Sequence, residues 1–366
     1  MWTETALSRR LAIRWPIVQG PFGGGISTVP LVAAVSNGGG LGSFGAHGLT
    51  GEEIVRTVRE IRAVTSAPFA INLWVPLEGN GHVAVDAAEA QRWLGPLAAF
   101  YRELRIAPPE LSRGAGIDFN EQVQAILETA PPAFSFVFGI PAPDVLEACR
   151  RRGIVTLGTA THVAEAEALE AAGVDVIVAS GLEAGGHRAS FLRPVDESPS
   201  TMALVSQVVQ TVRAPIVAAG GIADGRQIVA MLALGAAGVQ VGTAFLACDE
   251  SGASEAHKTM LGTVAARRTR LTRAFTGRPA RGIVNRFVVE MERYEGALAP
   301  YPVQNALTQP IRAAAGRAGC AELLALWAGQ NAPLVRRQPA ADLLEFLVED
   351  THRVRAALAA LNGAAY

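Results

Sequence analysis

Short runs of apolar, β-branched residues recur along the chain and alternate with longer amphipathic stretches. Runs such as VDVIVAS and APIVAAG show no polar alternation, which is typical of strands buried on both faces of a parallel sheet. Helix-length stretches separate most of these runs, for example 161–172 and 224–234. The pattern predicts eight strands, at residues 17–19, 41–43, 69–73, 133–137, 154–158, 174–179, 215–219 and 238–241.

Eight strand–helix units favour a closed (β/α)8 barrel, the TIM barrel, over an open sheet, because each helix returns the chain for another parallel strand. Residues 1–250 hold these units, with an insertion at about 74–120 after the third strand. The insertion is rich in Pro and Gly, and its pattern predicts a helix near 84–105. Residues 251–366 have a helical Ala/Leu/Arg pattern, so we expect a C-terminal extension or cap packed on the barrel.

The composition is that of a globular and nearly neutral chain. Hydrophobic residues make up 50%, and 32 Lys and Arg balance 33 Asp and Glu. This gives no electrostatic reason to expect nucleic acid or an anionic membrane as a partner. No apolar run of about 18 or more residues predicts a membrane span. The three cysteines lack metal or redox spacing, and no signal-peptide pattern opens the chain, which favours a cytoplasmic location.

The strongest chemical signal is a pair of glycine-rich motifs after the last two predicted strands, AAGGIADGRQ and GVQVGTAFL. Gly220 and Gly221 allow positive φ and a close approach of the backbone to a ligand. Asp224 is suited to cap the helix that follows. Free N–H groups at such turns, together with a helix dipole, bind phosphate, and barrel enzymes commonly bind phosphate after strands seven and eight. The alternative is two tight turns without a ligand.

A second polar, glycine-rich loop, SGLEAGGHRAS, follows the sixth predicted strand and carries His187. Loops at this face of a barrel hold the catalytic groups, and a histidine there is a candidate acid or base near neutral pH. A loop histidine with a purely structural hydrogen bond is the alternative. Glu183 and Arg188 are expected to be structural partners.

Two further segments are expected at the barrel mouth. VQGPFGGGIS follows the first strand, and its main-chain groups suit the edge of a flat heterocycle. Asn72 ends the third strand and presents an amide that both donates and accepts hydrogen bonds. A glycine-rich connection and a turn or capping role are the respective alternatives. Gly329 and Gln330 in the tail are weaker candidates to reach back over the ligand.

The remaining histidines do not form a metal site. We assign no functional role to His47, His82, His162, His257 and His352, which lack metal-ligand spacing, and no metal is expected. His162 is expected to begin a helix. The glycine-rich GGGLGSFG segment spans a short strand instead of linking a strand to a helix, which argues against a dinucleotide fingerprint.

Taken together, the motifs resemble the nitronate monooxygenase family, formerly called 2-nitropropane dioxygenases, whose relatives include flavin-dependent enoyl-acyl-carrier-protein reductases. The resemblance runs from Ile17 to about Gln330 and is carried by QGPFGGG, SGLEAGGHR, GGIADGR and GVQVGTAF. It implies an FMN-bound (β/α)8 barrel. It also implies a small-molecule reaction, in which O2 oxidises an alkyl nitronate to a carbonyl compound and nitrite.

The resemblance also implies the roles of individual residues. His187 would be the catalytic residue beside the flavin ring, and Phe22 and Val137 would share the substrate pocket with it. The expected FMN contacts are Gly20, Pro21, Phe22, Gly23 and Asn72 at the ring; Ser180, Gly181 and Gly186 at the ring or phosphate; Gly220, Gly221, Gln240, Gly242 and Thr243 at the phosphate and ribityl chain; and Gly329 and Gln330 from the tail.

The sequence departs from the family pattern at two positions. The family usually reads Q-A-P-M where this chain has Gln19-Gly20-Pro21-Phe22, so a bulkier side chain lies beside the ring. Many members carry a histidine in an S-F-H-F-G segment where this chain has Val137, which removes one polar partner for an anionic substrate.

Two other functions stay open at this point, and so does assembly. One is an NAD(P)H-dependent flavin reductase that acts on a quinone or an enoyl thioester. The other is a non-catalytic barrel that binds flavin or another phosphate compound. The sequence leaves a homodimer open as well.

Overall fold

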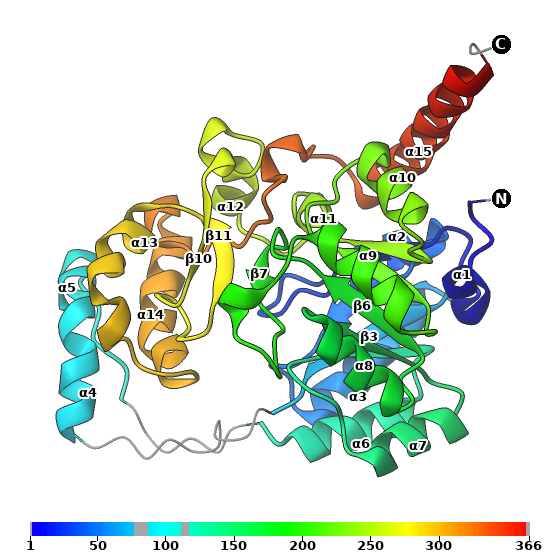
Figure 1. Ribbon diagram of the computed structural model, residues 1–366. Coiled ribbons are helices and arrows are strands. Elements are labelled where there is room, and N and C mark those ends of the chain that lie inside the picture. Colours follow the sequence, from blue (N-terminus) through cyan, green and yellow to red (C-terminus); the bar gives the residue numbers. More distant parts are fainter. Residues whose placement is uncertain (1, 77–86, 111–116, 364–366) are drawn as a thin grey trace.

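The computed structural model describes residues 2–76, 87–110 and 117–363 (Figure 1). Eight parallel strands are hydrogen-bonded in the order β1-β9-β8-β6-β5-β4-β3-β2. A parallel bridge between Val18 and Leu41 joins the two edges and closes the barrel. The eight strands are β1 Ile17–Gln19, β2 Gly42–Gly45, β3 Phe69–Trp74, β4 Ala133–Val137, β5 Val155–Ala160, β6 Val176–Ser180, β8 Ile216–Ala219 and β9 Gly238–Val241. The predicted (β/α)8 barrel is therefore confirmed, with strand ends shifted by at most two residues.

Helices between successive strands form the outer layer of the barrel. They are α2 Val29–Asn37, α3 Gly51–Val64, α6 Phe119–Thr129, α7 Pro143–Arg151, α8 Val163–Ala171, α9 Thr201–Thr211 and α10 Gly225–Ala233. The sequence supplies their start signals. Asp224 forms a capping box with Gln227 at the start of α10, as predicted, and His162 is the residue before α8. Apolar faces of these helices pack on the strands in one continuous core.

A separate apolar cluster fills the inside of the barrel. Small and branched side chains from the strands, such as Val18, Val178 and Val217, meet Leu7 and Leu11 from helix α1 Ala6–Leu11. Leu7 lies directly against Gly238 at the start of β9, so α1 plugs the amino-terminal end of the barrel. The opposite, carboxyl-terminal end is left for a ligand, as in other barrels of this kind.

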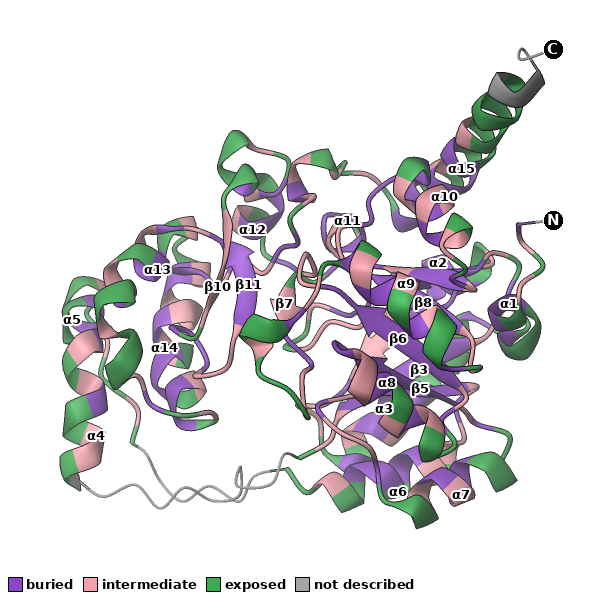
Figure 2. Ribbon diagram, in the orientation of Figure 1, coloured by how far each residue is buried: buried purple, intermediate pink, exposed green. Residues whose placement is uncertain are grey.

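The last helix, α15 Ala340–Gly363, returns to the barrel and takes the eighth place in its outer layer. It contacts α10 on one side and α2 on the other, and Leu343, Leu344 and Leu347 are buried in the barrel core. Asp350 accepts a hydrogen bond of 2.8 Å from the backbone N–H of Gly225. The distal turns of α15 project from the body and are exposed (Figure 2).

The insertion and the C-terminal extension form one cap with its own hydrophobic core (Figure 1). Phe100 from the insertion packs on Phe287 from the extension, with ring centroids 4.8 Å apart. The cap helices are α4 Ala87–Leu94, α5 Ala98–Leu104, α12 Glu255–Met260, α13 Arg286–Met291 and α14 Val303–Arg317. The short helix α11 Thr243–Leu246 belongs to the barrel and follows β9 directly. The helix predicted near 84–105 corresponds to α4 and α5, and its first residues, 84–86, lie outside the described residues.

The extension is mainly helical, and it also contains a hairpin that the sequence pattern did not predict. Strands β10 Thr269–Thr272 and β11 Ala280–Ile283 pair antiparallel, and β11 pairs in turn with β7 Gly186–His187 from the loop after β6. The two hairpin strands are only four residues long and contain Arg, Thr and Gly, so they lack the apolar run that marked the barrel strands. Division of the chain at residue 250 stays a prediction.

The burial pattern of α15 predicts that replacing two leucines on this helix by alanine will change the free energy of unfolding by very different amounts. Leu347 is fully buried, whereas Leu358 is 49% exposed. We expect Leu347→Ala to lower the free energy of unfolding by about 2–5 kcal/mol, because it leaves a cavity in the core. Leu358→Ala is the matched control and should change it by about 0.5 kcal/mol or less. Guanidinium unfolding measures both, and equal effects would contradict the assigned packing of α15.

Candidate active site

A cavity of about 660 Å³ lies at the carboxyl ends of the barrel strands, with walls from both the barrel and the cap. Its size is typical of a site for a small molecule or cofactor. Most residues that the sequence analysis selected line it. They are Gly20, Pro21, Phe22, Gly23, Asn72, Val137, Ser180, Gly186, His187, Gly220, Gly221, Gln240, Gly242, Thr243 and Gly329. The fold therefore brings together segments that are far apart in the sequence.

Two selected residues, Gly181 and Gln330, are not in the described lining of the cavity. Gly181 is held by two hydrogen bonds: its N–H donates to the carbonyl of Ala219, and its own carbonyl accepts from the Arg188 side chain. Gln330 is exposed, and its backbone N–H donates to the carbonyl of Glu183 at 3.0 Å. The neighbouring Asn331 lines the cavity instead.

Glu183 and Arg188 are structural partners, as predicted. The Glu183 carboxylate accepts hydrogen bonds of 2.8 Å from the N–H and the hydroxyl of Thr201. The buried Arg188 guanidinium donates to the carbonyls of Ser180 and Gly181 at 2.6 and 2.7 Å. These bonds shape the loop that carries His187 without placing a charge in the cavity.

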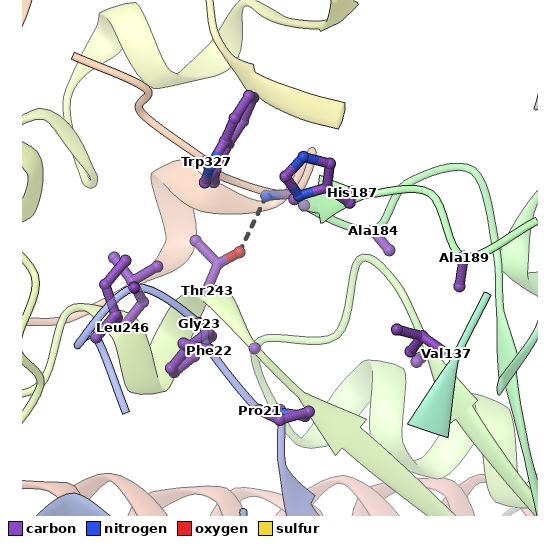
Figure 3. Close-up of a pocket in the computed structure, with 18 of the residues that line it drawn as sticks. Pro21, Phe22, Gly23, Val137, Ala184, His187, Ala189, Thr243, Leu246 and Trp327 are labelled. Carbon is purple, nitrogen blue, oxygen red and sulfur yellow. Dashed lines mark hydrogen bonds between the residues drawn. The ribbon is translucent and has the colours of Figure 1, made fainter. Parts of the chain in front are cut away.

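The glycine turns after β8 and β9 form a close backbone surface on the cavity. Gly220 and Gly221 have φ of 112° and 69°, and a Cβ at Gly220 would lie 2.6 Å from the Thr201 hydroxyl. Gly242 precedes α11, whose start has no side-chain cap. Thr243 accepts a hydrogen bond of 2.9 Å from the Gly329 N–H, which ties the cap to this turn (Figure 3).

The start of α10, which follows the Gly220–Gly221 turn, is capped by side chains of the protein itself. The first N–H groups of α10 are already used, because Gly225 donates to Asp350 and Arg226 donates to Asp224, both at 2.8 Å. These two carboxylates therefore satisfy the first N–H groups of the helix. The donors that remain for an anion are therefore in the glycine turns and at α11.

His187 is presented by the cap sheet and faces the cavity beside Trp327 (Figure 3). Its Nε2 lies 2.9 Å from the Thr276 hydroxyl oxygen, and its ring packs edge-on against Trp74 with centroids 5.1 Å apart. Burial is the main cause that lowers the pKa of His187 to about 3, and His47, Arg278 and Arg312 lower it further. The imidazole is therefore neutral near pH 7.

His47, to which the sequence analysis gave no role, also lines the cavity. Its ring stacks on Trp74 at 3.8 Å between centroids and lies against Gly23, where a Cβ would meet Cε1 at 2.0 Å. Burial lowers the pKa of His47 to about 4. Its buried Nδ1 has no hydrogen-bond partner in the part of the chain that the structure describes. One signal was available: His47 follows the carboxyl end of a predicted strand.

Several cap residues complete the wall and were missed because sequence patterns do not show how the cap packs. They are His257, Thr276, Tyr301, Asn305, Gln309, Arg312, Trp327 and Asn331. Asn305, Gln309 and Arg312 are spaced to share one face of α14, which was the available signal.

On the barrel side, Val137 ends β4 next to Trp74 of β3, with which it is in register. Asn72 donates its side-chain N–H to the Ser135 hydroxyl at 3.0 Å, which fixes the amide of a residue predicted to contact the ring. Within the described residues, no group of three or more His, Cys, Asp or Glu side chains could hold a metal ion. In the same part of the chain, no helix has the length and apolar character needed to cross a bilayer.

Comparison with known proteins identifies the family. The family model described as nitronate monooxygenase matches residues 4–350. The chain belongs to the nitronate monooxygenase family. It is 39% identical over 357 residues to a probable nitronate monooxygenase from Staphylococcus aureus strain Newman, covering 97% of this chain and 99% of that protein.

Solved structures agree with this assignment. A nitroalkane oxidase from Streptomyces ansochromogenes matches with a TM-score of 0.87 and 40% identity, covering 97% of this chain and all of that chain. FabK from Thermotoga maritima matches with a TM-score of 0.76 and 26% identity, covering 98% of this chain and 99% of that one. As a nitronate monooxygenase family member, the protein is a flavin-dependent oxidoreductase.

The residues in the cavity fit a flavin. Main chain approaches closely at Gly20, where a Cβ would lie 3.2 Å from Gly242, and at the positive-φ turn of Gly220 and Gly221. Uncapped N–H groups at α11 suit a phosphate, and the aromatic walls around Trp74 suit a flat ring.

The low pKa of His187 predicts how stability depends on pH. The unfolded chain binds the proton near pH 6.5 and the folded protein only near 3, so this contribution to stability is lost as the pH falls from 6.5 toward 3. The slope is about 1.4 kcal/mol per pH unit for each such histidine. We expect His187→Asn to unfold with a shallower pH dependence between pH 6.5 and 4.5, measured by guanidinium titration.

The matched control is His352→Asn, which replaces an exposed histidine. It should retain the wild-type pH dependence. Identical slopes for the wild type and His187→Asn would show that His187 titrates normally in the folded protein.

Proposed function

We propose that this protein binds FMN and uses O2 to oxidise alkyl nitronates to a carbonyl compound and nitrite. The observation that carries the proposal is the meeting of His187 with the glycine turns after β8 and β9 in one cavity. Family membership and the structural match to a nitroalkane oxidase support the reaction class.

In this proposal different segments of the cavity wall would contact different parts of FMN. The turns at Gly220–Gly221 and Gly242–Thr243 would hold the phosphate and ribityl chain, and the segment from Gly20 to Gly23 would lie along the ring with Asn72. Ser180, at the end of β6, and Gly186, next to His187 in β7, would contact the flavin. Bound FMN would supply the redox chemistry between the substrate and O2.

His187 would contact the substrate as a neutral imidazole. One nitrogen, Nε2, is engaged with the Thr276 hydroxyl, which orients the ring. A neutral imidazole has one donor and one acceptor nitrogen, so Nδ1 is left for a substrate atom. A group with a pKa of about 3 is a weak base near neutral pH, which favours stabilisation of the nitronate anion over proton abstraction from carbon.

Aromatic rings from both halves would keep water away from the reacting atoms. Trp74 from β3 and Trp327 from the cap both pack against His187, at 5.1 and 5.4 Å between centroids. Tyr301 packs against Trp74 at 6.1 Å. A site with such walls strengthens each hydrogen bond to a developing charge, because the local dielectric is low.

The structural match to FabK supports one alternative, an NAD(P)H-dependent flavin reductase. Mixing the purified protein with NADH under argon separates the two functions. Rapid bleaching of the flavin would favour the reductase, whereas nitrite release from ethyl nitronate in air, without NADH, would favour the proposed reaction.

Replacement of His187 tests its catalytic role. We expect His187→Asn to lower kcat/KM for ethyl nitronate by about 10²–10⁴-fold, because the anion loses its imidazole partner. FMN content, read from the visible spectrum, should be retained. His352→Asn is the control and should leave kcat/KM unchanged. Full turnover by His187→Asn would remove His187 from the mechanism.

The glycine turn predicts an effect on FMN binding. In Gly220→Ala the added Cβ would clash with Thr201 and the φ of 112° would be strained, so the turn must shift. Loss of a charge-assisted hydrogen bond to phosphate should weaken FMN binding about tenfold or more, measured by titration of the apoprotein.

Gly153→Ala is the matched control, since Gly153 also has positive φ (70°) but has open space around its Cβ position and does not line the cavity. It should destabilise the fold without weakening FMN binding. Equal FMN affinity in both variants would place the phosphate elsewhere.

A further inference from the structure

Arg312 is an unusual side chain in this cavity because of its charge. It is the one Asp, Glu, Lys or Arg residue among the described residues that line the cavity. It comes from α14 in the cap, together with Asn305 and Gln309, and these three residues share one face of the helix.

The guanidinium of Arg312 is only partly satisfied by the protein. One terminal nitrogen donates to the backbone carbonyl and the side-chain oxygen of Asn305, at 3.1 and 2.7 Å. Its Nε is buried and has no hydrogen-bond partner among the described residues. Within the described part of the chain, Arg312 forms no ion pair with a carboxylate. A sequestered charge without a counter-ion is costly, so the geometry calls for an anion from outside the protein.

The position of Arg312 distinguishes it from the glycine turns. Helix α14 lies against the segment that holds Thr276, the hydroxyl partner of His187, because the Gln304 side chain donates a hydrogen bond of 2.7 Å to the carbonyl of Ala274. The charge of Arg312, after that of Arg278, is also among the causes that lower the pKa of His187. Helix α14 lies in the cap, on the other side of β10 and β11 from α9 and α10 (Figure 1). Burial lowers the pKa of Arg312 to about 10, so it remains positively charged near neutral pH.

We propose that Arg312 is the counter-ion for the substrate, and that it makes the site select the anionic nitronate over the neutral nitroalkane. This inference rests on the proposed function. A nitronate carries its negative charge on two oxygens of one planar group, which matches the planar fork of a guanidinium. With Arg312 on one side and His187 on another, the substrate enters already deprotonated, and a strong base is not required.

The test uses the FMN-loaded enzyme and two probes, nitrite as an unreactive anion and ethyl nitronate as substrate. In Arg312→Met we expect FMN to be retained and the Kd for nitrite, read from the perturbed flavin spectrum, to rise about 10- to 100-fold, the value of a hydrogen bond to a charged group. KM for ethyl nitronate should rise similarly, while neutral nitroethane should be little affected. Arg312→Lys should restore part of the nitrite affinity.

Arg317→Met is the matched control, because Arg317 is exposed on the same helix. It should bind nitrite like the wild type. An unchanged nitrite Kd in Arg312→Met would overturn the inference even if nitronate turnover is normal. Loss of FMN in Arg312→Met and Arg312→Lys, but not in Arg317→Met, would overturn it by assigning Arg312 to the flavin phosphate.

Failure of the proposed function gives a different result. In that case the wild type would release no nitrite from ethyl nitronate, yet the nitrite titration would still compare Arg312→Met with the wild type. A weaker nitrite Kd there would keep Arg312 as an anion-binding residue of another reaction and would overturn its role with nitronate.

Discussion

The site depends on one backbone pairing, that of Gly186 and His187 with Ala280 and Arg281. The barrel strands do not hold His187 directly, because it lies seven residues beyond the end of β6, in a glycine-rich loop. Pairing with β11 makes this loop an edge strand of the cap sheet, and the Arg281 side chain adds a hydrogen bond of 2.9 Å to the carbonyl of Leu182. The orientation of His187 is therefore a property of the barrel–cap junction, and a change in cap packing would reach the cavity.

At this junction the barrel and the cap present surfaces of different chemistry to the molecules that the cavity would bind. The barrel offers backbone groups in glycine turns, which suit a cofactor that must be held closely. The cap offers side chains, among them Thr276, Tyr301 and Arg312, which suit discrimination between substrates. A barrel turn is constrained by the strand before it and the helix after it. A side chain on α14 can be substituted without disturbing the order of the strands. Differences in substrate among proteins of this fold are therefore expected to concentrate in the cap.

The sequence predicted the barrel well because parallel strands buried on both faces have a distinctive pattern, and glycine turns at strand ends reveal the ligand end of the barrel. Most of the selected cavity residues came from such turns. The cap was predicted only in outline, since β10 and β11 are short and polar and depend on pairing with β7, a contact across roughly ninety residues. His47 and Arg312 were missed for a related reason. Each has a buried nitrogen that lacks a hydrogen-bond partner among the described residues, and this can be seen only once the surrounding side chains are placed.

Val137 and Arg312 have a common physical interpretation. Val137 stands at the end of β4, at the position where the family pattern that the sequence resembles often has a histidine, and it leaves that part of the wall apolar. An anionic substrate still needs a partner for its charge, because transfer from water into a cavity lined by Trp74, Phe138 and Trp327 is unfavourable without one. Arg312 supplies a full charge from the opposite surface, whereas a histidine buried like His187 would be neutral near pH 7. Replacing a neutral partner on the barrel by a charged one on the cap would retain the reaction while changing which anions fit.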